Sequence, residues 1–280
     1  MTREQVSAAA RQACILEASA PKPGNVSPGR PFHDTRYEDF VASAEAIAPE
    51  MGRAGERPLG RTILAAVEAT ARVTRANTNL GIVLLFAPLA RAVLGAPRTA
   101  ASLHDRVRAT LASTTVADAA DVYAAIRLAH PGGLGAVADQ DVREAPTVTL
   151  LEAMRLAADR DDVAREYATG FDITFSLAVP ALRAARAEGF DWTLAVLDTY
   201  LSVLARRPDT LIARKRGRPE AEAVSARARN VQELGGVRTL AGCEAILALD
   251  AFLRDETNSR NPGTTADITA AAIFSVLLEG

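Results

Sequence analysis

The sequence predicts an all-α protein that forms a single globular multi-helix domain over residues 1–280. Apolar residues recur at helical spacing through almost every segment, and no Val/Ile/Thr-rich stretch alternates cleanly with period two. Hydrophobic residues make up 49% of the chain but aromatic residues only 5%, and alanine is abundant, which favours close packing of helix on helix. No 20–50-residue repeat and no low-complexity linker divides the chain, so one domain is favoured over two.

The helices are expected between breaker residues, which include Pro97 and Pro131-Gly132-Gly133. The first helix covers about 3–18, and the second covers about 36–48 and ends at Pro49. After a glycine-rich connector, helices are expected at about 59–75, 79–94, 99–111, 115–129, 148–158 and 161–187. Pro180 is expected to kink or split the last of these. The late helices are expected at about 191–204, 219–230, 236–254 and 265–279.

Composition excludes several classes of protein. The chain has 32 basic and 34 acidic residues and a net charge of −2, which argues against a nucleic-acid binder. No apolar run reaches the length of a membrane span, and no secretory signal is recognisable at the N-terminus. Cys14 and Cys243 lie in apolar helical contexts and are expected to be reduced core thiols. We therefore expect a cytoplasmic protein that uses neither a membrane nor nucleic acid.

The segment Pro21-Lys22-Pro23-Gly24-Asn25 is the most unusual connector, and His33-Asp34 follows it. Its two prolines exclude a helix, and Gly24 permits a backbone conformation that side chains disfavour. Lys22 is one of two lysines in a chain that otherwise uses arginine, which indicates a task for a compact point charge. The functional interpretation is an anion-binding corner, with Glu17 nearby and His33 as a general base. The alternative is a stiff connector with a solvated lysine, in which Asp34 or Thr35 caps the next helix.

Three further connectors carry polar residues in unusual density. Asn77-Thr78-Asn79-Leu80-Gly81 precedes an apolar helix, whose start suits either capping or phosphate binding. Asp209 is followed by Arg214-Lys215-Arg216, cations that suit a polyphosphate or a helix C-terminus. In the last connector, Arg260 precedes Pro262-Gly263-Thr264-Thr265-Ala266-Asp267, where Thr264 and Asp267 have the spacing of a capping box, or Asp267 points into a site. A fifth connector, His130-Pro131-Gly132-Gly133-Leu134-Gly135, matches no phosphate loop and is interpreted as a turn.

Taken together, these stretches resemble the triphosphoribosyl-dephospho-CoA synthase family. The shared elements are a Pro-Lys-Pro-Gly segment, a His-Asp element, an Asn-Thr-x-x-Gly helix entry, an Asp-Thr segment followed by Arg, and a late Pro-Gly-x-x-Ala-Asp. In this chain they start at Pro21, His33, Asn77, Asp209 and Pro262, in the same order and over nearly the whole length.

The resemblance implies an all-helical transferase whose active site is built from inter-helix loops. Such an enzyme moves the triphosphoribosyl group of ATP to a hydroxyl of dephospho-CoA and releases adenine. Breaking the glycosidic bond builds positive charge on the sugar, which carboxylates stabilise. The catalytic candidates are His33, Asp34, Asp209 and Asp267, with Asp34 and Asp267 also the candidate ligands of a Mg²⁺ ion. The candidate substrate-binding residues are Glu17, Lys22, Gly24, Asn77, Thr78, Asn79, Gly81, Arg214, Lys215, Arg260, Gly263, Thr264 and Thr265.

The resemblance leaves open the identity of the general acid, the residue that stacks on adenine and the state of assembly. One carboxylic acid needs a raised pKa to protonate the departing adenine, and the sequence does not say which. Aromatic residues are few, so Phe32, Tyr37 and Phe171 are the candidates for stacking on adenine. A homodimer is a candidate assembly.

The chain also departs from the family pattern. Better-known members carry His-Lys where this chain has Asn79-Leu80, which removes a charge and a titratable group. The departures make a different acceptor conceivable, such as the precursor of a pterin- or furan-type one-carbon cofactor. A Mg²⁺-dependent helical hydrolase of ADP-ribosyl substrates and a non-catalytic helical interaction protein are the competing functions. An interaction protein predicts that Lys22, His33, Asp209 and Asp267 do not cluster.

Overall fold

The computed structural model describes residues 1–95, 101–133, 135 and 139–280. Within these residues it confirms the all-α prediction, because every regular element is helical and no strand occurs. The N-terminal part contains α1 (Arg3–Ser19), α2 (Tyr37–Gly52), α3 (Leu59–Ala71), α4 (Leu80–Leu94), α5 (Leu103–Ala112), α6 (Val116–Ala129), α7 (Leu150–Ala157) and α8 (Asp162–Thr169). The C-terminal part contains the π-helical turn η1 (Thr174–Ala178), α9 (Val179–Ala187), α10 (Trp192–Arg206), α11 (Thr210–Arg216), α12 (Arg218–Glu233), the 3₁₀ turn η2 (Gly236–Arg238), α13 (Leu240–Leu253) and α14 (Gly263–Glu279).

Several helices begin where side chains bind the free amide groups of the first turn. Thr2, Thr115 and Thr149 each form a capping box with the residue three positions later. Asp191 caps α10 in the simpler way, by accepting a hydrogen bond from the Leu194 amide. These local signals are why the expected starts of α1, α6, α7 and α10 agree closely with the structure.

The structure corrects three expected helix boundaries. Pro49 does not end α2, because it lies within the helix, which continues for three further residues to Gly52. The helix expected over 161–187 is divided at Gly170-Phe171, where both residues have positive φ. The split expected at Pro180 corresponds to the change from the π-helical turn η1 to α9, which begins at Val179. Residues 210–216, which we did not expect to form a separate helix, form α11. Pro97, residues 99–100 of the expected fifth helix and Leu134 lie outside the described residues.

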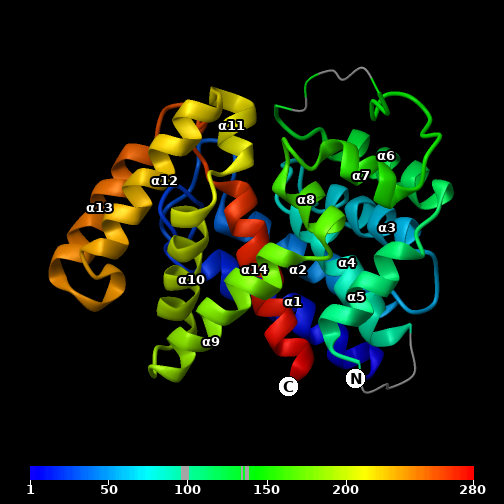
Figure 1. Ribbon diagram of the computed structural model, residues 1–280, viewed down its shortest axis with the longest axis horizontal. Helices are drawn as coiled ribbons and strands as arrows, with labels where there is room; N and C mark the ends of the chain where they lie inside the picture. Colours follow the sequence, from blue (N-terminus) through cyan, green and yellow to red (C-terminus); the bar gives the residue numbers. More distant parts are fainter. Residues whose placement is uncertain (96–100, 134, 136–138) are drawn as a thin grey trace.

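Helix α14 lies at the centre of the molecule (Figure 1) and contacts α1, α4, α9 and α10. Helices α12 and α13 lie on one side of it in this view, and α5–α7 lie on the other. The larger apolar core joins α1–α10 and α14, and it includes the stacked rings of Phe86 and Phe274, whose centroids are 4.3 Å apart. A smaller core joins α10 to α11–α13. Residues at the starts of α4, α11 and α14 line one cavity, which lies where the larger core and the smaller core adjoin.

Two further expectations concern cysteine and membrane contact. Both cysteines are free, but Cys14 alone is buried, so the prediction that Cys243 is a core thiol is wrong. Cys243 lies on the exposed face of α13, because the buried face of that helix is formed by Ile246, Leu249 and Leu253. Among the described residues no helix is both long and apolar enough to cross a membrane.

Candidate active site

The unusual connectors converge on one cavity of about 570 Å³. Both the Lys22 corner and the stretch from Gly263 to Asp267 contribute to its wall, although they lie at opposite ends of the sequence. The predicted site residues that line it are Glu17, Lys22, Asp34, Asn77, Thr78, Asn79, Gly81, Arg214, Lys215, Gly263, Thr264 and Asp267. Five predicted residues lie outside the lining: Gly24, His33, Asp209, Arg260 and Thr265.

Lys22 is buried, with 1% of its surface exposed, and forms an ion pair with Glu17 at 2.9 Å between Nζ and Oε1. The ammonium also donates to the backbone carbonyls of Glu17 and Ala20. These three acceptors match the three donors of a lysine side chain. Lys22 therefore neutralises and orients Glu17, and it could contact a phosphate only by giving up one of these partners.

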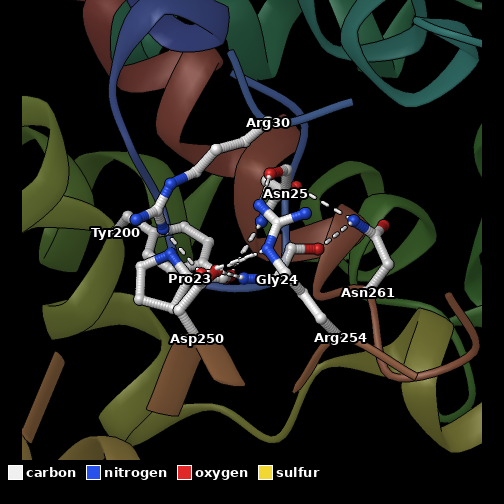
Figure 2. A network of polar contacts seen from close by, with 8 residues as sticks. All are labelled: Pro23, Gly24, Asn25, Arg30, Tyr200, Asp250, Arg254 and Asn261. Carbon is white, nitrogen blue, oxygen red and sulfur yellow. Dashed lines mark hydrogen bonds and ion pairs between the residues drawn. The ribbon is translucent and has the colours of Figure 1, made fainter. Parts of the chain in front are cut away.

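The turn that follows Lys22 is held by a polar network (Figure 2). Asp250 of α13 accepts hydrogen bonds from the Gly24 amide at 2.8 Å and from Arg30 at 2.6 Å. Tyr200 donates to the Pro23 carbonyl at 2.7 Å. Gly24 has a φ of +72°, and a Cβ there would lie 2.8 Å from the Leu253 Cβ, so a side chain would not fit. Gly24 is thus a structural residue of the turn rather than a ligand contact.

The same network brings two asparagines to the cavity wall. Asn261 donates from Nδ2 to the Gly24 carbonyl at 2.8 Å and to Asn25 Oδ1 at 3.2 Å, and Arg254 donates to the Asn25 carbonyl at 2.6 Å. Asn25 and Asn261 both line the cavity. We did not predict these residues as ligands, although each belongs to one of the unusual connectors.

Asp267 faces the cavity from the first turns of α14 and packs against Gly81 of α4. A Cβ at position 81 would lie only 2.0 Å from Asp267 Oδ2, so glycine is needed for this approach. Burial and the neighbouring carboxylates of Glu17, Asp209 and Asp161 raise the pKa of Asp267 well above its ordinary value. Asp267 is therefore a carboxyl group of the cavity wall with a raised pKa, the property that a general acid requires.

Asp209 is buried behind the wall, which corrects its expected role as a group that contacts substrate. Its Oδ1 caps α11 by accepting from the amides of Leu211 and Ile212, and its Oδ2 accepts from the amide and hydroxyl of Thr265. Burial is the main cause that raises its pKa, against these hydrogen bonds. Asp209 and Thr265 thus fasten α11 to the start of α14, and neither lines the cavity.

The expected roles of His33 as a general base and of Arg260 as a substrate-binding residue are also corrected by their positions. The His33 side chain is 63% exposed; its Nδ1 lies 3.1 Å from Asn258 Nδ2 and its Nε2 lies 3.7 Å from Asp34. Asp34 lines the cavity, but His33 does not. Arg260 forms an ion pair with Glu220 and stacks on Phe252, with 4.7 Å from its guanidinium carbon to the ring centroid. Arg260 is held away from the wall by these partners, whereas His33 lies beside two wall residues, Asn258 and Asp34, without lining the cavity itself.

The α4 entry contributes three consecutive predicted residues. Asn77 accepts from the Leu80 amide at 3.2 Å and so provides the capping expected of this connector. The Thr78 hydroxyl is 2.6 Å from that of Ser43. Asn79 accepts from the Thr70 hydroxyl at 3.2 Å, and its Nδ2 is buried without a partner among the described residues.

Two cations of the wall, Arg214 and Lys215, come from α11. Arg214 forms an ion pair with Asp161, which also caps α8, while its buried Nε has no partner within the described part of the chain. Burial lowers the pKa of Lys215. Arg75 and Arg160 also line the cavity. We did not predict Arg75, Arg160 or Asp161, because each lies beside a helix end where a charged residue is ordinary.

A third part of the wall is largely apolar and comes from α6, α7 and α8. Its residues are Tyr123, Ile126, Ala153, Met154, Ala157, Val163 and Ala164. Of the three aromatic candidates, Phe32 alone lines the cavity. The Tyr37 hydroxyl lies 2.8 Å from that of Ser19, and Phe171 is fully buried in the core, so neither is available for stacking.

The family model for ATP:dephospho-CoA triphosphoribosyl transferase matches residues 3–280. The chain belongs to this family. The resemblance described from the motifs is therefore confirmed, and family membership disfavours the hydrolase and the interaction protein.

Individual relatives agree with the family model. The chain is 36% identical over 112 residues to "Probable 2-(5''-triphosphoribosyl)-3'-dephosphocoenzyme-A synthase" of Pseudomonas fluorescens, a match that covers 40% of this chain and 38% of the relative. It is 33% identical to the corresponding synthase of Klebsiella pneumoniae, with 40% and 39% covered. The matches thus span about two fifths of the length of these curated relatives. A solved structure from Archaeoglobus fulgidus, of a "putative triphosphoribosyl-dephospho-coA synthase", is 29% identical with a TM-score of 0.66, over 86% of this chain and 99% of that one.

Proposed function

We propose that this member of the family transfers the triphosphoribosyl group of ATP to a hydroxyl of dephospho-CoA and releases adenine. The observation that carries the proposal is the meeting of Asp267, an acid with a raised pKa, with a row of cations in one cavity of about 570 Å³. Such a volume is in the range of ligand pockets. The donor, ATP, carries adenine at one end and the triphosphate at the other. The acid suits the end from which adenine departs, and the cations suit the end that carries the phosphates.

In the reaction, the bond between ribose C1′ and adenine breaks, and a bond forms between C1′ and the acceptor oxygen. Asp267 gives its proton to the departing adenine, which leaves as a neutral base. The acceptor hydroxyl loses its proton as the new bond forms, and the wall carboxylates Glu17 and Asp34 replace His33 as the candidate bases. Negative charge near the sugar stabilises the positive charge that develops on it.

The triphosphate is assigned to the cationic part of the wall. Arg214 and Lys215 enter from α11, and Arg75 and Arg160 from the ends of neighbouring helices. Arginine forms paired hydrogen bonds with phosphate, and lysine acts as a point charge. The apolar part of the wall from α6–α8 is assigned to the adenine ring, because burial of that ring needs apolar surface.

Magnesium is proposed as a companion of the nucleotide. Among the described residues no group of three or more His, Cys, Asp or Glu side chains could hold a metal ion. Mg²⁺ commonly uses one or two carboxylates together with substrate phosphates, which fits this wall. Asp34 is the more suitable ligand, because a proton retained on Asp267 competes with a metal there.

The experiment that tests the proposal incubates the purified protein with ATP, Mg²⁺ and dephospho-CoA, and measures adenine and the mass of the coupled product by chromatography with mass spectrometry. We expect both to appear together and only with the acceptor. Adenine without any acceptor would indicate a hydrolase. No adenine with dephospho-CoA, but adenine with a precursor of a pterin- or furan-type cofactor, would overturn the proposed acceptor. A homodimer and a cytoplasmic location stay predictions, for light scattering and cell fractionation respectively.

A further inference from the structure

Asn79 has an unusual hydrogen-bonding state for a buried side chain. It is 6% exposed and lies immediately before α4, on the wall of the large cavity. Its Oδ1 accepts from the Thr70 hydroxyl at 3.2 Å, and its Nδ2 has no partner among the described residues. Buried polar groups nearly always have a partner, so this donor is available to a ligand in the cavity.

The surroundings of Asn79 contain carboxyl groups, and the charge of Glu17 among them is already balanced by Lys22, whose Nζ lies 2.9 Å from Glu17 Oε1. Asn79 and Glu17 border a second, much smaller void of about 10 Å³, next to Cys14 and Ser43. Asp267 packs against Gly81, two residues after Asn79, and lies close enough to Glu17 for the two carboxyl groups to interact. A single neutral donor therefore faces the same corner as two carboxyl groups.

This combination selects among the groups of a nucleotide. A phosphate oxygen would gain little attraction at this corner, because the charge of Lys22 is already paired with Glu17, and it is better served by Arg214 and Lys215 of the same wall. An adenine nitrogen can accept from Asn79 but offers nothing to a carboxylate from the same atom. A hydroxyl group accepts through its oxygen and donates through its hydrogen, so it satisfies both kinds of neighbour.

We propose that Asn79 Nδ2 donates to a ribose hydroxyl of the nucleotide, whose own hydrogen is donated to the neighbouring carboxylate of Glu17. This assignment rests on the proposed function, because it takes ATP as the ligand. It makes Asn79 a specificity-determining residue that distinguishes ribose from deoxyribose.

A competing explanation comes from the small void. About 10 Å³ is near the smallest volume that holds a water molecule, and a water there could accept from Asn79 Nδ2. In that case the amide would have no role in recognising the sugar. The loss of affinity on removing a ribose hydroxyl would then not depend on the residue at position 79.

The test compares ATP, 2′-deoxy-ATP and 3′-deoxy-ATP by calorimetric titration of the wild-type protein and of Asn79→Ala, with Mg²⁺ and without acceptor. We expect the wild type to bind at least one deoxy analogue about tenfold more weakly than ATP. In Asn79→Ala the same ratio should fall close to one. Asn230→Ala is the matched control, since Asn230 is an exposed asparagine of α12 that does not line the cavity, and it should keep the wild-type ratio.

The outcomes separate the two proposals. If the wild type does not bind ATP, the proposed function fails and the inference with it. If it binds ATP and both deoxy analogues equally, or if Asn79→Ala keeps the wild-type ratio, the inference is overturned while ATP binding stands. Should Asn79→Ala fail to fold by circular dichroism, Asn79→Asp provides the second variant. It keeps the oxygen that accepts from Thr70 but replaces the Nδ2 donor with an oxygen, and an unchanged ratio there would equally contradict the inference.

Discussion

Asp209 and Asp267 lie in the same region, but their different partners suit them to different roles. The pKa values of both Asp209 and Asp267 are raised, with burial as the largest cause in each. Asp209 accepts four hydrogen bonds at 2.7–3.0 Å from α11 and α14. Asp267 instead faces the cavity beside other carboxyl groups. The first aspartate is therefore suited to holding two helices together, and the second to delivering a proton.

Replacing Asp267 should separate these roles. We expect Asp267→Asn to lower adenine release at least about a hundredfold, because the amide cannot supply the proton, while the melting temperature is kept. Asp209→Asn is the comparison variant, and it should lose about 2 kcal/mol or more of unfolding free energy because hydrogen bonds at both helix starts are disturbed. Turnover assays beside melting curves measure both effects. Full activity in Asp267→Asn would exclude it as the acid.

The raised pKa of Asp267 also predicts a direction of pH dependence. The acid must carry its proton to act, so the turnover rate should fall as the pH rises through the pKa of Asp267. Because the pKa is raised, this loss should occur well above the range of an ordinary aspartic acid. A profile of kcat against pH checks the prediction, and a rate that increases steadily with pH would contradict it.

At the scale of elements, α8 and the π-helical turn η1 carry a second buried acid that the proposed reaction does not use. Glu166 accepts from the amide and hydroxyl of Thr174 through Oε1, at 2.6 and 2.7 Å. Its remaining oxygen, Oε2, is buried without a partner among the described residues. Burial raises the pKa of Glu166 to about 8, so the side chain is protonated at neutral pH.

This state makes the stability of the protein depend on pH. The unfolded chain loses the Glu166 proton near pH 4.5 and the folded chain near pH 8, so raising the pH between these values favours unfolding. Glu166→Gln resembles the protonated acid and removes the titration. Urea unfolding at pH 5 and pH 8 should therefore show the wild type losing on the order of 4 kcal/mol relative to Glu166→Gln. A constant difference between the two proteins would refute the assignment.

At the scale of the whole molecule, the cavity depends on charges supplied by distant helices. Lys215 of α11 lines it and the neighbouring Arg216 does not, although both residues are exposed. The two residues differ in placement but carry the same charge, which makes them a matched pair for testing the phosphate assignment.

Lys215→Ala should raise the KM for ATP several-fold, with a smaller effect at high salt because screening already weakens the attraction. Arg216→Ala should leave the KM within about twofold of the wild type. Steady-state kinetics at two ionic strengths would measure this. Equal effects of the two substitutions would indicate that net charge matters rather than a phosphate contact at Lys215.

Much of this organisation was predictable from sequence, and the failures have physical causes. The capping residues Thr115 and Thr149 act on amides within a few positions, so the starts of α6 and α7 were predicted closely. Pro49 misled because α2 continues past it for three residues, although a proline there cannot donate to the carbonyl four residues earlier. His33 and Arg260 misled because Asn258 and Glu220, their partners, lie far away in sequence.

The sequence by itself determined the helices, the polar connectors and the family, because these follow from periodicity, breakers and the order of motifs. Only the tertiary structure decided which carboxyl group of the cavity has a raised pKa, which cations line the cavity and which buried amide group has no partner among the described residues. The physical reason is that a pKa or an unsatisfied donor depends on everything packed around a group. For Asp267 those neighbours include Glu17 of α1, Asp161 beside α8 and Asp209 beside α11, which come together only when the chain has folded.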